Sequence, residues 1–284
     1  MSRILIPADL SEASVNTITY GLQLAHAYGQ EVTLMHIVDL YKYAAGTSES
    51  EIYTELSARK DVSMILKNAE AAVEKMLHDI RQQATFPVNP KVNIRSGKLL
   101  NEIQKEIDEG DVFCLLMSVS EIRKKQSITH LNYSLLNKVN CPVLLIPHDA
   151  VFTPLRKILY ASSLVRIDLT AIQRVVNYAE KNNAEITVAH IFEEVSNFND
   201  ECRLRGFKSL LQEQTNYPIH ISSFVEEDVI KGIAGIARKS QSDLLVLLKR
   251  RQKILRSIIN KSNTERLAFA LNIPMLFYPE SYLK

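Results

Sequence analysis

The sequence predicts an α/β protein with two doubly wound domains, each built around a five-stranded parallel sheet. Its 284 residues correspond to about two domains at roughly 150 residues per domain. Short apolar runs alternate with longer segments in which apolar residues recur at helical spacing, a pattern typical of strand–helix units around a parallel sheet. The two halves of the chain also align with each other, which indicates an internal duplication.

The duplication is visible in two blocks that align without gaps. Residues 3–39 align with 157–193, and residues 111–147 align with 243–279, each with nine identities in 37 positions. The offset between the copies falls from 154 to 132, so the first copy carries about 22 additional residues. We place the insertion in residues 41–57.

The first copy contains five apolar runs of strand length, near residues 3–7, 31–37, 91–95, 112–117 and 143–147. Segments of helical period lie between them, near residues 12–28, 61–84, 99–109 and 127–138. The first of these helices requires a residue that accepts hydrogen bonds from its unpaired first-turn amides. Asp9, Ser11 or Ser14 could provide that cap.

The second copy repeats this order. Strands are expected near residues 157–161, 185–191, 219–225, 243–248 and 274–278. Helices are expected near residues 168–181, 199–215, 229–240 and 261–271. Two prolines, Pro147 and Pro154, interrupt the chain between the copies, so we expect domains at residues 1–149 and 150–284.

The composition narrows the class of protein. Apolar residues make up 46% and charged residues 23%, which is enough material for a packed core. The longest uncharged apolar runs are far shorter than the ~18 residues of a membrane span, and the N-terminus lacks the order of a signal peptide. We therefore expect a cytoplasmic protein that does not insert into membranes. A net charge of +2 argues against a dedicated nucleic-acid binder.

The three cysteines, Cys114, Cys141 and Cys202, show no metal-ligand spacing. We expect reduced, mostly structural thiols and no metal site.

Several segments in each copy resemble those of one protein family. In the first copy they are Ile4-Leu5-Ile6-Pro7-Ala8-Asp9, Leu34-Met35-His36-Ile37-Val38, Gly97 before a helix, Asp111 before a strand, and Asn140-Cys141-Pro142-Val143-Leu144. In the second copy they are Lys157-Ile158-Leu159, Val188-Ala189-His190-Ile191, Ser242-Asp243-Leu244-Leu245-Val246 and Ile273-Pro274-Met275-Leu276. The chain thus resembles a tandem universal stress protein over nearly its whole length.

The resemblance implies a specific pairing of the copies. In the family, domains pair through the edge strand that carries the Cys-Pro-Val-Leu-like segment, so residues 143–147 and 275–279 would lie side by side in an intramolecular pseudo-dimer. Apolar strand edges need such cover. A homodimer is a further option.

The ATP site of the family is expected to be lost in both copies. Nucleotide-binding members carry a Gly-x2-Gly-x9-Gly-Ser/Thr motif after the fourth strand, where backbone amides hold the phosphates. The corresponding residues 116–132 and 248–264 contain no glycine. Side chains there would crowd a polyphosphate and disfavour the turns of the loop.

A remnant of the nucleotide pocket is expected in the first copy. By resemblance it would comprise Pro7, Ala8, Asp9, Ile37 and Gly97. Asp9 has an alternative role as a helix cap, which is the interpretation we favour. The second copy has Ser163 in place of Asp9 and is the more degenerate one.

Two basic runs replace the glycine loop, Arg123-Lys124-Lys125 in one copy and Lys249-Arg250-Arg251 in the other. Their side chains, Arg250 and Arg251 above all, could hold an anion by charge, although a solvated loop is the simpler interpretation.

Enzyme motifs are missing from the sequence, which has no nucleophile elbow, no zinc-protease motif and no Walker loop. His36 and His190 occupy equivalent positions and are expected to be structural, and the same holds for His130 and His148. Ser118, Ser120 and His130 are the candidates for a nonstandard catalytic site.

The inserted segment carries Tyr41, Tyr43 and Tyr53. These rings could form a contact surface or pack over the first domain's own crevice. We expect a non-enzymatic stress-response protein that acts through an unknown protein partner, without a cofactor. The alternative is a sensor that binds a nucleotide or another small anion in the first domain.

Overall fold

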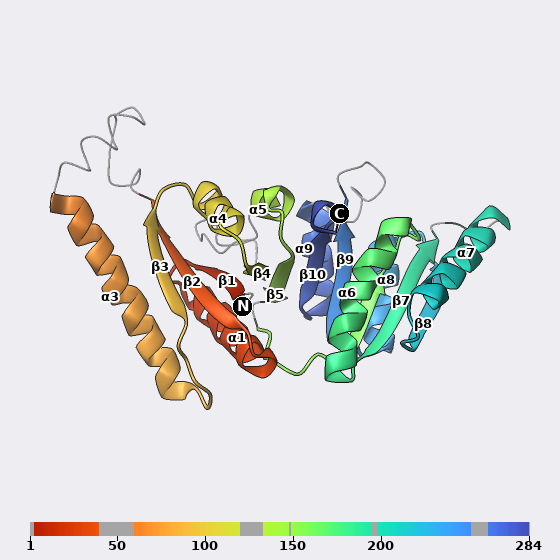
Figure 1. The fold of residues 1–284 in the computed structure, drawn as a ribbon, viewed down its shortest axis with the longest axis horizontal. Coiled ribbons are helices and arrows are strands. Elements are labelled where there is room, and N and C mark those ends of the chain that lie inside the picture. Colours follow the sequence, from red (N-terminus) through yellow and green to blue (C-terminus); the bar gives the residue numbers. More distant parts are fainter. Residues whose placement is uncertain are drawn as a thin grey trace. The chain divides into compact units, whose positions relative to one another are not determined.

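The structure is a computed structural model that describes residues 3–39, 60–119, 133–147, 149–192, 194, 198–250 and 261–283. The chain divides into two compact units, Met1–Val139 and Asn140–Lys284 (Figure 1). Each unit is an α/β arrangement whose strands alternate with helices along the chain.

The first unit contains a four-stranded parallel sheet in the order β3-β2-β1-β4. Its strands are β1 (Arg3–Ala8), β2 (Glu31–Val38), β3 (Lys91–Ser96) and β4 (Val112–Val119). Its described helices are α1 (Glu12–Tyr28), α3 (Lys60–Gln83), α4 (Leu99–Asp108) and α5 (Tyr133–Lys138). The chain passes from β1 to β2 to β3 in one direction across the sheet and then returns to the other side of β1 to form β4. Because parallel strands are joined by right-handed crossovers, this change of direction places α1 and α3 on one face of the sheet and α4 and α5 on the other. The helices α1 and α3 do contact each other.

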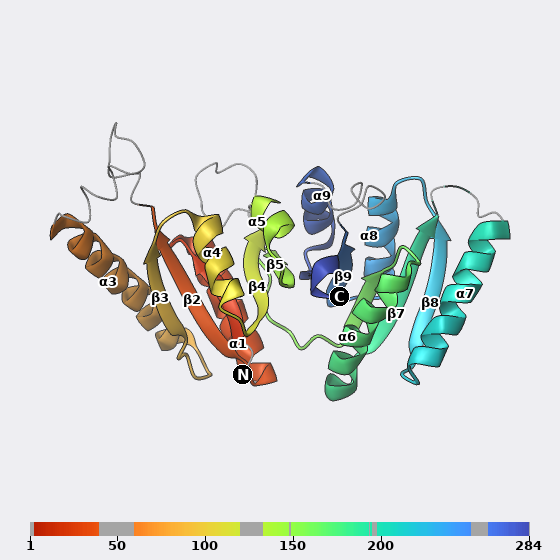
Figure 2. The ribbon, with the colours of Figure 1, turned by 45° about the horizontal axis from the view of Figure 1, so that its top comes forward.

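The second unit contains six strands in the order β5-β10-β9-β6-β7-β8. They are β5 (Val143–Pro147), β6 (Lys157–Ala161), β7 (Glu185–Phe192), β8 (Ile219–Val225), β9 (Leu244–Lys249) and β10 (Met275–Pro279). The helices are α6 (Arg166–Asn182), α7 (Phe198–Gln214), α8 (Val229–Lys239) and α9 (Lys261–Leu271), and a 3-10 turn, η3 (Glu280–Tyr282), follows β10. Helix α6 packs against α7. Helix α8 packs against α9, and these two lie side by side in Figure 2.

Strand β5, the last strand of the first sequence repeat, belongs to the second unit. It pairs antiparallel with β10, with Leu145 opposite Met275 and Val143 opposite Phe277. All other described strand pairs of the second unit are parallel. The side-by-side placement of residues 143–147 and 275–279 is therefore confirmed. The domain boundary at 149/150, which marks the end of the sequence repeat, stays a prediction.

Equivalent residues of the two copies adopt the same left-handed backbone conformation. Helix α1 ends at Gly29 with φ 62°, and α6 ends at Asn183 with φ 50°, 154 positions later. Glycine and asparagine are the residues that adopt this left-handed conformation at least cost. Leu10 and Leu164, with φ 64° and 55°, are a second equivalent pair. Each precedes a helix cap and lies in position to pack on the first helical turn.

The fold class and all ten predicted strands are confirmed. The predicted helices are confirmed as well, but residues 127–132 of the helix expected at 127–138 lie outside the described residues. Cys114 and Cys141 are buried and Cys202 is exposed. Within the described part of the chain, no helix has the length and apolar character needed to cross a membrane.

Candidate functional site

Four residues of the predicted pocket lie at one edge of the first unit's sheet. Pro7 and Ala8 end β1, Ile37 lies near the end of β2, and Gly97 follows β3. β2 pairs in parallel with both β1 and β3. Because the carboxyl ends of parallel strands meet at the same edge, the structure brings these residues together. Their role in binding stays a prediction.

Asp9 lies in the turn between β1 and α1 and organises the start of the helix. Its Oδ1 accepts hydrogen bonds from the Ser11 backbone N–H at 3.1 Å, from Ser11 Oγ at 2.6 Å and from Ser14 Oγ. Ser11 is the cap residue, and its Oγ accepts from the Ser14 N–H at 3.3 Å. Ser11 is thus the cap among the three candidates, and Asp9 supports it from two positions upstream.

Gly97 occupies a position that excludes a side chain. Its φ is 148°, which other residues rarely adopt, and a Cβ there would lie 3.1 Å from Cγ of Glu102. The Gly97 N–H donates to the Val38 carbonyl at 3.1 Å, which ties the end of β3 to the end of β2.

His36 and His190 have the same structural role in the two copies. Nδ1 of His36 lies 2.8 Å from the Ala8 carbonyl, and Nδ1 of His190 lies 2.7 Å from the Ser162 carbonyl. Because a carbonyl only accepts, Nδ1 carries the proton in both rings. Each histidine therefore joins its own strand to the end of the neighbouring strand, as the structural interpretation expects.

The second copy holds a carboxylate that the sequence analysis missed. Asp168, in the first turn of α6, is fully buried. Its Oδ1 accepts from the Tyr160 hydroxyl at 2.8 Å. Its Oδ2 accepts from Ser162 Oγ at 2.8 Å, from the Ser163 N–H at 3.0 Å and from the Val165 N–H at 3.1 Å. Four donors thus converge on one carboxylate.

The alignment of the copies shows where this carboxylate comes from. With the offset of 154, Ser163 takes the place of Asp9, and Asp168 takes the place of Ser14. The acid and the hydroxyl have changed places between the strand-end turn and the helix. In both copies a carboxylate accepts a hydrogen bond from a backbone N–H of the turn between the first strand and the first helix. This carboxylate is in the turn itself in the first copy, at Asp9, and on the helix in the second copy, at Asp168. The reciprocal exchange is the sequence signal that could have identified Asp168.

Burial controls the ionisation of this network. Desolvation raises the pKa of the Asp168 carboxyl above its ordinary value, and its four hydrogen bonds oppose that shift. Burial, followed by the neighbouring Asp168 charge, raises the pKa of the Tyr160 hydroxyl well above its usual range. The tyrosine therefore keeps its proton at neutral pH and remains a donor.

His190 is linked to the surface through Arg203 of α7. Nη2 of Arg203 lies 3.5 Å from Nε2 of His190, the nitrogen that carries no proton when Nδ1 donates to Ser162. Burial lowers the pKa of His190, and the nearby Arg203 charge lowers it further, although the Ser162 carbonyl opposes the shift. The ring is thus held in its neutral form.

Two polar groups at the ends of the fourth strands lack a partner among the described residues. Ser118 in β4 is 1% exposed and its Oγ makes no hydrogen bond there. Arg250 directly follows β9 and is half-buried, and its buried Nε is likewise without an acceptor. The structure brings Arg250 to the carboxyl end of the sheet, where an anion site was predicted.

Several predicted residues lie outside the described part of the chain. These are Arg251, Ser120, His130, His148, the basic run 123–125 and the tyrosines at 41, 43 and 53. Among the residues that the structure does describe, no group of histidine, cysteine and acidic side chains could hold a metal ion.

Comparison with solved structures agrees with this architecture. A universal stress protein from Archaeoglobus fulgidus has a TM-score of 0.67 and 18% identity, covering 98% of this chain and 96% of its own. A functionally unknown protein from Pseudomonas aeruginosa has a TM-score of 0.59 and 16% identity, covering 99% and 94%. At these identities the matches show the fold alone.

Comparison of sequences identifies the family. A search of curated proteins found no significant match. The profile of the universal stress protein family, however, matches residues 1–147, which is more than half of the chain. The duplicated sequence, the strand order and this match agree: the chain belongs to the universal stress protein family.

Proposed function

We propose that this chain is a cytoplasmic, non-enzymatic stress-response protein that acts by contacting another protein, and that neither copy holds ATP in a glycine-loop cradle. The observation that carries the proposal is that Asp9 and Asp168, the carboxylates near the start of the first helix of each copy, accept hydrogen bonds from the protein itself. Asp168 is fully buried and accepts from four protein donors. Oδ1 of Asp9 accepts from two serines at the start of α1.

The phosphate end of the site supports the same proposal. Residues 116–132 and 248–264 contain no glycine, so a triphosphate would meet side chains where binding members offer bare amides. Both strand-end histidines are also engaged by backbone carbonyls through Nδ1. That geometry suits a structural role better than proton transfer during a reaction.

Isothermal titration of the full chain with Mg-ATP tests the proposal. We expect no saturable heat at millimolar nucleotide and no release of phosphate over hours. Saturable one-site binding that is abolished by Asp9→Ala, or turnover above the level of a buffer control, would contradict it. Circular dichroism of the Asp9→Ala variant provides the folding control.

A second candidate is a sensor for a nucleotide or another small anion in the first copy. It is favoured by Oγ of Ser118, which is buried near the end of β4 and has no hydrogen-bond partner among the described residues. Gly97 also retains a backbone conformation that leaves the end of β3 free of side chains.

A thermal-shift series with ATP, AMP, cyclic AMP and inorganic phosphate separates the two candidates. A ligand at a hundredfold excess over its dissociation constant would stabilise the protein by about 2.7 kcal/mol. The sensor requires such a shift for at least one ligand and its loss in Ser118→Ala. The anion hypothesis for the second copy requires its loss in the double variant Arg250→Gln/Arg251→Gln instead.

A further inference from the structure

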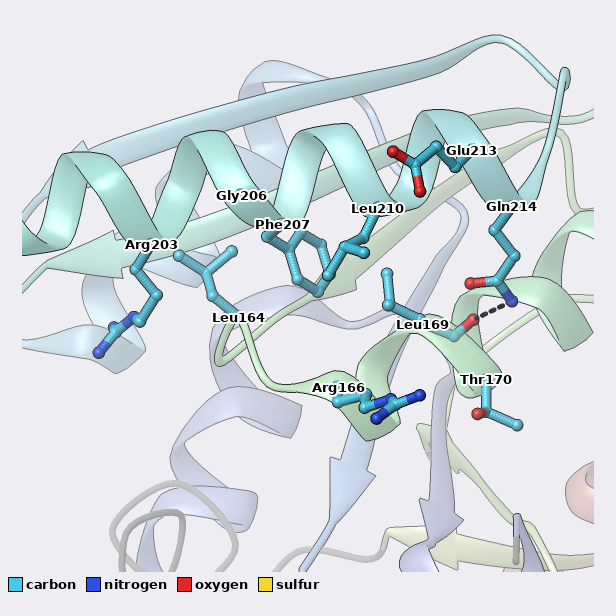
Figure 3. Close-up of a pocket in the computed structure, with 10 residues that line it drawn as sticks. All are labelled: Leu164, Arg166, Leu169, Thr170, Arg203, Gly206, Phe207, Leu210, Glu213 and Gln214. Atoms are coloured by element: carbon cyan, nitrogen blue, oxygen red, sulfur yellow. Dashed lines mark hydrogen bonds between the residues drawn. The ribbon is translucent and has the colours of Figure 1, made fainter.

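A groove of about 780 Å³ lies between α6 and α7 of the second unit, outside the sheet edge described above (Figure 3). Its middle is apolar and is formed by Leu164, Leu169, Phe207 and Leu210. Phe207 is buried, whereas the Leu210 side chain is 49% exposed although it is large and apolar. The volume is in the range of sites for small organic ligands.

The residues from α7 lie on one face of that helix. Arg203, Phe207, Leu210 and Gln214 are spaced by four, three and four residues, which is the repeat of a single helical face. From Arg203 to Glu213 the groove extends for about 15 Å along the helix axis, at 1.5 Å per residue. Gln214 Nε2 donates to the Leu169 carbonyl at 3.2 Å and ties α7 to α6 at that end (Figure 3).

The charges along the groove are unequal. Arg203 of α7 lies at one end of the groove and Glu213 at the other, near Gln214 (Figure 3). Arg166 of α6 adds a second cation, and its guanidinium points away from Arg203, toward Thr170 (Figure 3). Among the described residues, neither arginine forms an ion pair with a carboxylate. The neutral ring of His190 accepts at most one of the five N–H groups of Arg203. The remaining N–H groups of Arg203 can therefore donate to a ligand.

The first copy provides an internal comparison. Its corresponding groove, between α1 and α3, has a volume of about 480 Å³ and is lined by Leu10, Val15 and Met76 among other residues. Lys75 and Asp79 are its charged lining residues, and they lie four positions apart on α3, so their charges balance. Of these two grooves in the described part of the chain, only the one in the second copy has an excess of positive charge.

We propose that the α6–α7 groove binds an amphipathic organic carboxylate of the fatty-acid type, with its carboxylate at Arg203, at the end away from Glu213, and its chain along Leu164, Phe207 and Leu210. A guanidinium matches the geometry of a carboxylate and binds it through two parallel hydrogen bonds. Glu213 repels the headgroup from the opposite end and fixes the direction of binding. The chain buries the exposed Leu210 side chain.

Titration of the full chain with dodecanoate, below its micelle concentration, tests this site. We expect saturable binding of one molecule, and at least tenfold weaker binding of octanoate because each methylene removed reduces the buried apolar surface. Dodecanol, which has the same chain without the charge, is expected to bind at least tenfold more weakly.

Variants locate the site. The double variant Arg166→Gln/Arg203→Gln is expected to weaken dodecanoate binding at least tenfold, and both side chains are exposed, so the fold is expected to persist. Arg203→Lys keeps the charge but loses the two parallel hydrogen bonds, so its affinity for dodecanoate is expected to lie between those of the wild type and the double variant. Lys75→Gln in the first groove is the matched control and is expected to have no effect.

Three results would overturn the proposal: no saturable binding of dodecanoate by the wild type, equal affinity for dodecanol, or unchanged affinity in the double arginine variant. A circular dichroism spectrum of each variant confirms that it is folded.

Discussion

At the scale of single residues, the two copies differ most in how they use one carboxylate. In the first copy Asp9 is half-buried in a turn and supports the cap at Ser11. In the second copy the acid is on the helix, at Asp168, and is enclosed by its donors. A group that a ligand could approach in one copy has become part of the core in the other.

Replacement of Asp168 by alanine is therefore expected to destabilise the protein strongly. It leaves the Tyr160 hydroxyl, Ser162 Oγ and two backbone N–H groups without their acceptor. The expected loss is on the order of 3 kcal/mol, since each unsatisfied buried group costs ~1–3 kcal/mol and water can replace some of the contacts. Chemical denaturation measures it.

Asp9→Ala in the first copy is the matched control. Asp9 is partly exposed and supports a cap, so the expected loss is only about 1 kcal/mol. Equal losses in the two variants would contradict the different roles assigned to the two acids.

His190 is expected to make the second unit sensitive to mild acid. Burial lowers its pKa in the folded state from 6.5. Below pH ~6.5 the unfolded chain therefore binds a proton that the folded chain does not, and the free energy of unfolding falls as the pH falls toward the lower, folded-state pKa. Asp168 and Asp200 act against the shift, while Arg203 adds to it.

His190→Asn keeps a donor for the Ser162 carbonyl but does not titrate. Thermal unfolding at a series of pH values between about 7 and 5 is expected to show a smaller loss of stability in this variant than in the wild type. Identical slopes would exclude His190 as the cause.

At the scale of elements, α4 is held to the first unit's sheet by Glu106. The side chain of Glu106 is only 2% exposed and its Oε1 accepts from Arg3 Nη2 at 2.9 Å and from Asn93 Nδ2 at 3.1 Å. Its Oε2 pairs with Arg95. One carboxylate thus joins α4 to both β1 and β3.

Glu106→Gln is expected to lower the free energy of unfolding by about 3 kcal/mol, because it leaves Arg3 without its carboxylate partner and removes from Arg95 the most deeply buried of its carboxylate partners. Glu109, which also pairs with Arg95 at 3.2 Å, has a side chain that is 58% exposed. Glu109→Gln is expected to cost less than about 1 kcal/mol. Denaturant titration of the two variants distinguishes them, and similar losses would refute the assignment to Glu106.

The elements themselves were largely predictable. Alternating apolar runs and helical faces identified every strand, because a strand buried on both sides of a parallel sheet needs a continuous apolar run. Gly29 and Asn183, which end equivalent helices, also follow from local chemistry. The Asp168 network did not follow, because its donors come from a strand, a turn and a helix. The α6–α7 groove depends on which side chains two packed helices leave uncovered, so it was not predictable either.

At the scale of the whole molecule, the sequence repeat and the compact unit end at different places. The repeat places β5 in the first copy, whereas β5 packs in the second unit through its pairing with β10. Repeat boundaries record how the chain was duplicated, and unit boundaries record which surfaces are buried together. The alignment of the two copies alone therefore could not predict the boundary between the compact units.

Two fragments test this division. Residues 140–284 include β5, whereas residues 150–284 leave β10, with the buried Met275 and Phe277, as an open edge. The shorter fragment is expected to aggregate, or to be less stable by about 3 kcal/mol or more, since each core side chain contributes ~1.5–3 kcal/mol on burial. Light scattering and thermal unfolding measure both effects. Equal solubility and stability would show that β5 is dispensable to the second unit.

The proposal for both copies is that the chain keeps the family's fold but does not hold a triphosphate in a glycine cradle. A crystal structure of the full chain grown with saturating Mg-ATP tests it most directly. The account predicts no nucleotide at the carboxyl ends of the strands in either copy, with Asp168 still bound to its four donors. An intact ATP molecule in either place, with its phosphates held by residues that follow β4 or β9, would contradict it.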